Sequence, residues 1–168
     1  VASERRHWAL VGSGFEKIAA NEIRIKMSEL CYKSIACDFT EDKKHIDLSS
    51  EPFVIVCASA TPSAMVSDVV KEVAIFKAHQ SLPIVIATEG EDRFDPYAAG
   101  VIKVPVYKGA LSFLLSTMVG HLFGYYAAAS FDAFADRLRG IRTGLAQDLL
   151  LSEHDSLEDG ANLPDELS

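Results

Sequence analysis

Two carboxylates, an amine and an imidazole lie close enough together in this chain to transfer protons. Glu22, Lys26 and Glu29 follow one another at intervals of four and three residues, which places all three on one face of a helix. His45 comes sixteen residues after Glu29. A carboxylate base, a neighbouring cation and a histidine that titrates near neutral pH suit general acid–base chemistry. The alternative is a solvated, salt-bridged helix face with a solvated loop histidine.

A strand, a turn and a helix must position these groups. Residues 7–11 form a short apolar run that predicts a buried strand, and Gly12, Ser13 and Gly14 predict the turn that ends it. The helix is then expected over residues 15–32. Its expected inward face consists of Ile18, Ala19, Ile23, Ile25, Met27, Leu30 and Cys31.

The rest of the chain alternates strand-like and helix-like segments. The strand-like runs are continuously apolar, which is typical of a parallel sheet covered on both faces. The predicted fold class is α/β, with a three-layer αβα arrangement around a doubly wound, five-stranded parallel sheet. The further strands are expected at 34–39, 52–58, 83–88 and 101–106, and the helices at 63–80, in the uncharged run 109–131, and at 131–151.

Three segments are expected along the chain. Residues 1–130 form the main domain, 131–151 an amphipathic helix, and 152–168 an acidic, disordered tail. The chain begins with Val1 rather than Met, so we expect a piece of a longer protein.

Composition narrows the classes of function. The chain has 16 Lys and Arg against 24 Asp and Glu, a net charge of −8, which argues against a nucleic-acid partner. The uncharged run 109–131 is long enough for a bilayer, but its polar residues and glycines favour a buried helix, and no membrane partner is expected. Cys31, Cys37 and Cys57 suit neither a disulfide framework nor a zinc site; we expect buried thiols in a cytoplasmic protein without a metal or cofactor.

A second candidate site follows the strand at 52–58. Ser59, Thr61 and Ser63 lie between this strand and the helix at 63–80. Hydroxyls and free backbone N–H groups at such a junction can hold a phosphate. Simple N-capping of the helix is the alternative. Ligands in doubly wound folds bind at the carboxyl ends of the strands, which is where these residues are expected.

The stretch from Gly12 to His45 resembles a sugar isomerase (SIS) domain, and more narrowly the second of the two SIS domains in the isomerase half of glucosamine-6-phosphate synthase (glutamine–fructose-6-phosphate aminotransferase). The family pattern is a G-x-G turn, E-x-x-x-K-x-x-E on a helix, a tyrosine three residues on, and a Lys-His pair. Here these are Gly12 and Gly14, then Glu22, Lys26 and Glu29, then Tyr32, then Lys44 and His45.

The resemblance implies an aldose–ketose step on a phosphosugar such as fructose 6-phosphate, in a domain of SIS or flavodoxin-like type. In the family, the residue matching Glu29 moves a proton between C1 and C2, the residue matching Lys26 lies in the sugar site, and the one matching His45 assists ring opening in the neighbouring subunit. The expected partner is a second copy or a second SIS domain of the same chain. The candidate substrate-binding residues are Glu22, Gly12, Ser13, Gly14, Ser59, Thr61 and Ser63.

The chain also departs from the family. Ile46 and Asp47 stand where the family has Gly-Pro, and nothing after Ala129 matches the family's lysine-bearing tail. A non-catalytic sugar-phosphate-binding module and a dimerisation module therefore stay as alternatives to an enzyme.

Overall fold

Five strands of the described chain form one parallel sheet. The computed structural model describes residues 5–43, 52–107, 109 and 111–161, with side chains as far as Leu151. The strand order is β2-β1-β3-β4-β5 with every pair parallel, the flavodoxin-like order. This confirms the predicted fold class. The strands are β1 (Trp8–Gly12), β2 (Ala36–Asp38), β3 (Phe53–Cys57), β4 (Leu82–Thr88) and β5 (Gly100–Val104).

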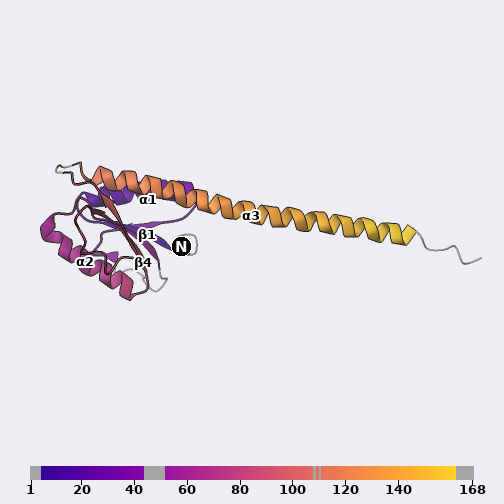
Figure 1. Ribbon diagram of the computed structural model, residues 1–168, viewed down its shortest axis with the longest axis horizontal. Coiled ribbons are helices and arrows are strands. Elements are labelled where there is room, and N and C mark those ends of the chain that lie inside the picture. The colour runs from indigo at the N-terminus through magenta and orange to yellow at the C-terminus, as the bar shows by residue number, and fades with distance from the viewer. Residues whose placement is uncertain (1–4, 44–51, 108, 110, 162–168) are drawn as a thin grey trace, which may run out of the picture. The chain divides into compact units, whose positions relative to one another are not determined.

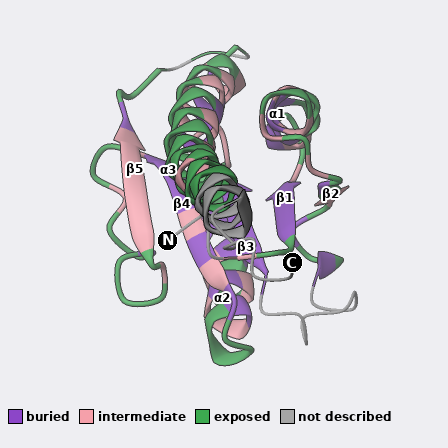
Figure 2. Ribbon diagram, turned by 90° about the vertical axis from the view of Figure 1, so that its right-hand side faces the viewer, coloured by how far each residue is buried: buried purple, intermediate pink, exposed green. Residues whose placement is uncertain are grey.

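The centre of the sheet is covered on both faces. All five residues of β1 and all five of β3 are buried, and β5 at the edge is mostly half-buried (Figure 2). Leu10 of β1 pairs with Ile55 of β3, which pairs with Ile84 of β4. A strand with no solvated face needs apolar residues at successive positions, which explains the continuous apolar runs in the sequence.

Helices lie on both faces of the sheet (Figure 1). They are α1 (Glu16–Cys31), α2 (Ser63–Ala78) and α3 (Phe113–Ala161). On the face of α2, Val54 and Val56 of β3 share a buried cluster with Val69 and Phe76. The first part of α3 lies with α1 on the opposite face, where the rings of Phe53 and Phe123 stack with their centroids 5.4 Å apart.

A glycine lets α1 and α3 approach each other closely. A Cβ atom at Gly120 of α3 would collide with the side chain of Ile23, which is fully buried on α1. Gly124, one turn on, lies against Met27, where a Cβ would be 3.2 Å from Cγ. The two helices therefore pack backbone to side chain over this part of the sheet.

The inward face of α1 differs from the expected one. Ile18, Ile25 and Leu30 are 52, 42 and 39% exposed, because the inward face of α1 is narrower than expected and is filled by Ala19, Ala20, Ile23 and Met27.

α3 is one continuous helix, although two helices meeting near residue 131 were expected. The alanines at 127–129 favour helix, and no proline interrupts the segment before Pro164. The helix also continues to Ala161, whereas a disordered tail was expected from residue 152. Residues 162–168 lie outside the described residues.

The chain divides into two compact units, Val1–Ala129 and Ser130–Ser168. The first contains the sheet with α1 and α2, and the second contains the greater part of α3. No helix in the described part of the chain is both long and apolar enough to cross a bilayer.

Replacing Gly120 with alanine should destabilise the first unit by roughly 1–3 kcal/mol, because the added methyl overpacks the contact with Ile23. The readout is urea unfolding followed by fluorescence of Trp8, the single tryptophan, which is 3% exposed. Gly140→Ala is the matched control, since its Cβ would meet nothing within 4 Å. Equal midpoints for the two variants would contradict the close packing of α1 on α3.

Candidate functional site

A buried carboxyl lies where the carboxyl ends of the central strands meet α1. Glu16, the first residue of α1, is 0% exposed. Its Oε1 accepts hydrogen bonds from the Ser59 hydroxyl, at 2.9 Å, and from the Ala60 amide. Ser59 and Ser116 of α3 lie 2.8 Å apart, oxygen to oxygen. One carboxyl group thereby joins α1, the segment after β3, and α3.

Burial raises the pKa of the Glu16 carboxyl, and its hydrogen bonds oppose that effect only in part. Its Oε2 is buried without a hydrogen-bond partner among the described residues. The folded protein therefore favours the neutral acid more than the unfolded chain does.

A pocket of about 220 Å³ opens at the carboxyl ends of β3 and β4, beside the first turn of α2. Thr61, Ser63 and Thr88 are among the residues that line it, and the Thr88 hydroxyl donates to the Ser59 carbonyl at 2.6 Å. The hydroxyl of Ser59 is instead committed to Glu16 and Ser116. Of the three residues expected to hold a phosphate, the structure thus brings Thr61 and Ser63 together at the pocket.

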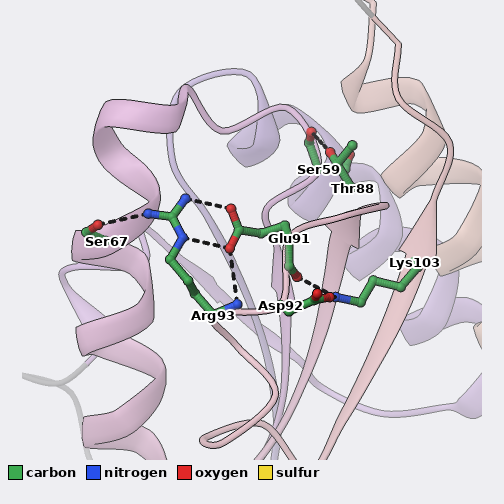
Figure 3. Close-up of polar contacts among 7 residues, drawn as sticks. All are labelled: Ser59, Ser67, Thr88, Glu91, Asp92, Arg93 and Lys103. Carbon is green, nitrogen blue, oxygen red and sulfur yellow. Dashed lines mark hydrogen bonds and ion pairs between the residues drawn. The ribbon is translucent and has the colours of Figure 1, made fainter.

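Two acidic residues, Glu89 and Glu91, line this pocket, and Figure 3 shows the ion pairs of Glu91 and of its neighbour Asp92. Glu91, which lines it, accepts hydrogen bonds from the Arg93 guanidinium at 2.7 and 2.6 Å. Arg93 also donates to the Ser67 hydroxyl at 3.0 Å, and its pairing lowers the pKa of Glu91. Lys103 lies 2.8 Å from Asp92. The negative charge of Glu91 is therefore offset, whereas the exposed Glu89 adds a carboxylate to the wall.

The predicted proton-transfer residues form a second, exposed cluster on α1. Lys26 Nζ lies 3.0 Å from Glu29 Oε2, and the two side chains are 39 and 60% exposed. Glu29 raises the pKa of Lys26, which keeps the amine cationic. Glu22 Oε1 lies 3.4 Å from Nε2 of His121 on α3. The structure therefore brings Lys26 to Glu29 and Glu22 to His121, and His45 lies outside the described residues.

The two clusters lie at different ends of α1. Glu16 is at its first turn, beside the carboxyl ends of the strands, and Glu29 is thirteen residues further on. At 1.5 Å per residue this is about 20 Å along the helix axis. The far end of α1 lies near the beginning of β1, because Nζ of Lys33, just past the helix, is 4.9 Å from the centre of the Trp8 ring. The pocket lined by Thr61 and Ser63 and the Lys26–Glu29 pair are thus not one site within this unit.

The glycine turn at residues 12–14 positions the start of α1, where the buried Glu16 lies. A Cβ at Gly12 would collide with the carbonyl of Glu16, and Gly14 has a φ of 59°, a conformation that favours glycine. Ser13 donates to Glu41 at 2.7 Å. These contacts show the turn shaping the start of α1, while a role in substrate binding stays a prediction.

The sequence reasoning missed Glu16, Ser116, His121 and Arg93. An acidic residue in the first turn of a helix usually interacts with the helix dipole at the surface, so nothing local marks Glu16 as buried. His121 and Ser116 gain their partners from α1 and from the segment after β3, which are distant in sequence.

No group of three His, Cys, Asp or Glu residues close enough to hold a metal ion occurs in the described part of the chain. Its three cysteines are free, with Cys57 buried and Cys31 and Cys37 half-buried.

The comparisons with known proteins define the class of the fold. No protein-family model matches the chain. The C-terminal domain of glucosamine-fructose-6-phosphate aminotransferase from Francisella tularensis superposes with a TM-score of 0.67 at 14% identity, over 76% of this chain and 36% of that one. The Vibrio vulnificus NanR protein, solved with ManNAc-6P, superposes with a TM-score of 0.61 at 9% identity, over 80% of this chain and 53% of that one. The fold is that of a SIS domain.

The sequence is similar to one particular enzyme. It is 30% identical over 120 residues to the isomerizing glutamine–fructose-6-phosphate aminotransferase of Corynebacterium diphtheriae, a match that covers 67% of this chain and 19% of the relative. This confirms the resemblance predicted from Gly12 to His45. The chain spans about a fifth of the length of that relative.

Glu16→Gln should remove the part of the pH dependence of the unfolding free energy that titration of the Glu16 carboxyl causes. Burial raises the pKa of Glu16 in the folded protein. The stabilisation that its proton gives to the folded state is therefore fully present below the unfolded pKa of about 4.5, and it is lost as pH rises through the folded pKa. The variant, which cannot ionise, should therefore gain stability relative to wild type as pH rises above 4.5.

The measurement is the urea midpoint from Trp8 fluorescence at a series of pH values. Thr143→Val is the control, since its hydroxyl donates to the Arg139 carbonyl and is not among the groups that bond Glu16, and it should keep the wild-type slope. Parallel curves for Glu16→Gln and wild type would rule out a raised pKa.

Proposed function

We propose that this chain is a phosphosugar-binding SIS domain of a glucosamine-6-phosphate-synthase-like enzyme that acts on fructose 6-phosphate or a close relative. The observation that carries the proposal is the pocket lined by Thr61, Ser63 and Thr88 at the carboxyl ends of β3 and β4. Hydroxyls beside the first turn of a helix suit a phosphate, because the helix dipole and its leading N–H groups attract anions.

The names of the relatives support the same ligand class. Fructose 6-phosphate stands in the name of the Corynebacterium enzyme, and the Vibrio protein was solved with ManNAc-6P. The pairing of Arg93 with Glu91 also supports this ligand class. It offsets one of the two carboxylates, Glu89 and Glu91, that would repel a phosphate in the pocket. We expect the domain to work in the cytoplasm, which its free thiols support.

The catalytic part of the proposal assigns roles on α1. Glu29 transfers the proton between adjacent carbons, and Lys26 stabilises the negative charge that develops on the substrate oxygen. His45 opens the sugar ring. Because Glu29 and Lys26 are exposed in this chain, chemistry requires a second SIS domain, from the same parent chain or from a second copy, to exclude water from them.

Apolar side chains beside this cluster support such a partner. Ile18 and Ile25 on α1 are 52 and 42% exposed, and Met118 and Leu122 on α3 are 63 and 60% exposed. Exposed apolar side chains gathered on neighbouring helices are typical of a face that packs against another domain. The same residues would exclude water from a sugar held against Lys26 and Glu29.

A non-catalytic sugar-phosphate-binding or dimerisation module is the second candidate. Glu29 lies about 20 Å along α1 from Glu16, which bonds Ala60 beside the pocket-lining Thr61. This separation favours the second candidate, because the domain could bind a ligand without presenting Glu29 to it.

Fructose 6-phosphate should stabilise the wild-type chain, by about 2.7 kcal/mol at a hundredfold excess over its Kd. The double variant Thr61→Val, Ser63→Ala should lose at least tenfold in affinity, so that the gain shrinks by about 1.4 kcal/mol at the same ligand concentration. Thermal unfolding with increasing ligand measures both.

Thr143→Val is the control variant, because its hydroxyl, within the described part of the chain, bonds only to the Arg139 carbonyl of its own helix. Unphosphorylated fructose is the control ligand and should have no effect. If no hexose phosphate stabilises the wild type, the pocket is not a phosphosugar site.

Glu29→Gln in the full-length parent protein should lower the rate of isomerisation by about 10²- to 10⁴-fold, the usual contribution of a general base. Asp68→Asn is the matched control, because Asp68 forms a similarly exposed (i,i+3) pair with Lys71, at 2.9 Å on α2. Its rate should equal that of wild type. An undiminished rate for Glu29→Gln would show that Glu29 is not the base.

A further inference from the structure

The second unit presents a stripe of exposed apolar side chains. Phe134, Leu138, Ile141 and Leu145 are 58, 51, 60 and 59% exposed. Their spacings of four, three and four residues place them within about 60° of the helix circumference. We call these four residues the Phe134–Leu145 stripe. Such spacing is typical of the seam of a coiled coil.

No other part of the described chain buries the helix segment that carries this stripe. Within the described residues 131–151 none is buried. Gly140 and Gly144 lie inside this segment, and both disfavour a helix relative to alanine. Since most helices in proteins are stabilised by packing of an apolar face, this segment needs a partner against the stripe.

A hollow lies beside the stripe. Ala135, Leu138, Arg139 and Arg142 surround a hollow of about 200 Å³. Leu138 is the residue that this hollow shares with the stripe, so the hollow adjoins one flank of the stripe.

Charges beside the stripe indicate what the partner is. Arg137 and Asp148 are exposed, lie on the same flank, and have no ion-pair partner among the described residues. They are about 16 Å apart along the axis. Arg139, by contrast, is held away from the stripe by Asp132, at 3.1 Å, and by Asp136. Arg142 is likewise exposed without an ion-pair partner among the described residues, but it lies on the other flank. Arg137 and Asp148 are opposite in sign and stand toward opposite ends of the stripe.

We propose that the Phe134–Leu145 stripe packs against the same stripe of a second copy of this chain, with the two helices antiparallel. Ile141 then faces Ile141 of the other copy, and Leu138 faces Leu145. This register brings Arg137 of each copy within about one helical turn of Asp148 of the other, so the ion pair forms twice.

A parallel arrangement is disfavoured by the same charges. In register, it places Asp148 beside Asp148 of the other copy, and Arg137 beside Arg142 across the seam. Like charges at these positions repel and select against a pairing. The antiparallel contact is separate from the sugar pocket and from the α1 face proposed for a second SIS domain, so it stands or fails independently of the proposed function.

Sedimentation velocity of the whole chain over a concentration series tests the contact. Leu145→Glu should raise the dimer dissociation constant at least tenfold. Leu150→Glu is the matched control: this leucine is 66% exposed, five residues on, and faces away from the stripe, so its dissociation constant should stay within twofold of wild type. Trp8 fluorescence verifies that the first unit of each variant is folded.

Charge reversal tests the orientation. Arg137→Asp and Asp148→Arg should each weaken the dimer, and the double variant should restore it. A wild type that stays monomeric at 200 µM, or a dimer unaffected by Leu145→Glu, would overturn the proposal. If Arg137→Asp instead strengthens the dimer, the helices pair in parallel and the antiparallel arrangement is wrong.

Discussion

A single buried carboxyl holds together the part of this domain where its ligand is proposed to bind. Glu16 accepts hydrogen bonds from the segment after β3, and Ser59 continues the contact to Ser116 on α3. The start of α1 can be this close only because residue 12 is glycine, whose missing Cβ leaves room for the Glu16 carbonyl. Burial of an ionisable group is costly, so the arrangement holds best with the proton bound. The Ser59 hydroxyl is consequently a structural group, and the pocket wall is left to Thr61, Ser63 and Thr88.

The direction of α1 then determines how the site is divided. The helix begins at the carboxyl ends of the strands and runs back along the sheet, so that Lys26 and Glu29 lie far from the pocket. The proposed anion pocket and the proposed acid–base groups therefore lie toward different ends of α1. Under the proposed function, both act on one small substrate only when another domain completes the site. The exposed apolar side chains on α1 and on the first part of α3 are consistent with that requirement.

Much of the fold could be predicted from the sequence. Continuous apolar runs such as residues 53–57 and 8–12 indicate a parallel sheet, because strands covered on both faces have no solvated side. Long-range packing was harder to predict. Gly120 was counted simply as one of several glycines in an uncharged run, whereas it admits Ile23 of α1. The length of α3 also differs from the prediction, since the acidic composition predicts disorder whereas the helix, which contains no proline, continues to Ala161.

The sequence by itself determined the α/β class, the five strands, and the Glu22–Lys26–Glu29 pattern that marks the resemblance to a SIS domain. These depend on spacing along the chain, which local hydrogen bonding and hydrophobic periodicity convert directly into helices and strands. Only the tertiary structure decided that Glu16 is buried, that Ser59 turns away from the pocket, and that Glu22 meets His121. Those outcomes depend on which segments, distant in sequence, come together when the two faces of the sheet are covered, and no local pattern encodes that choice.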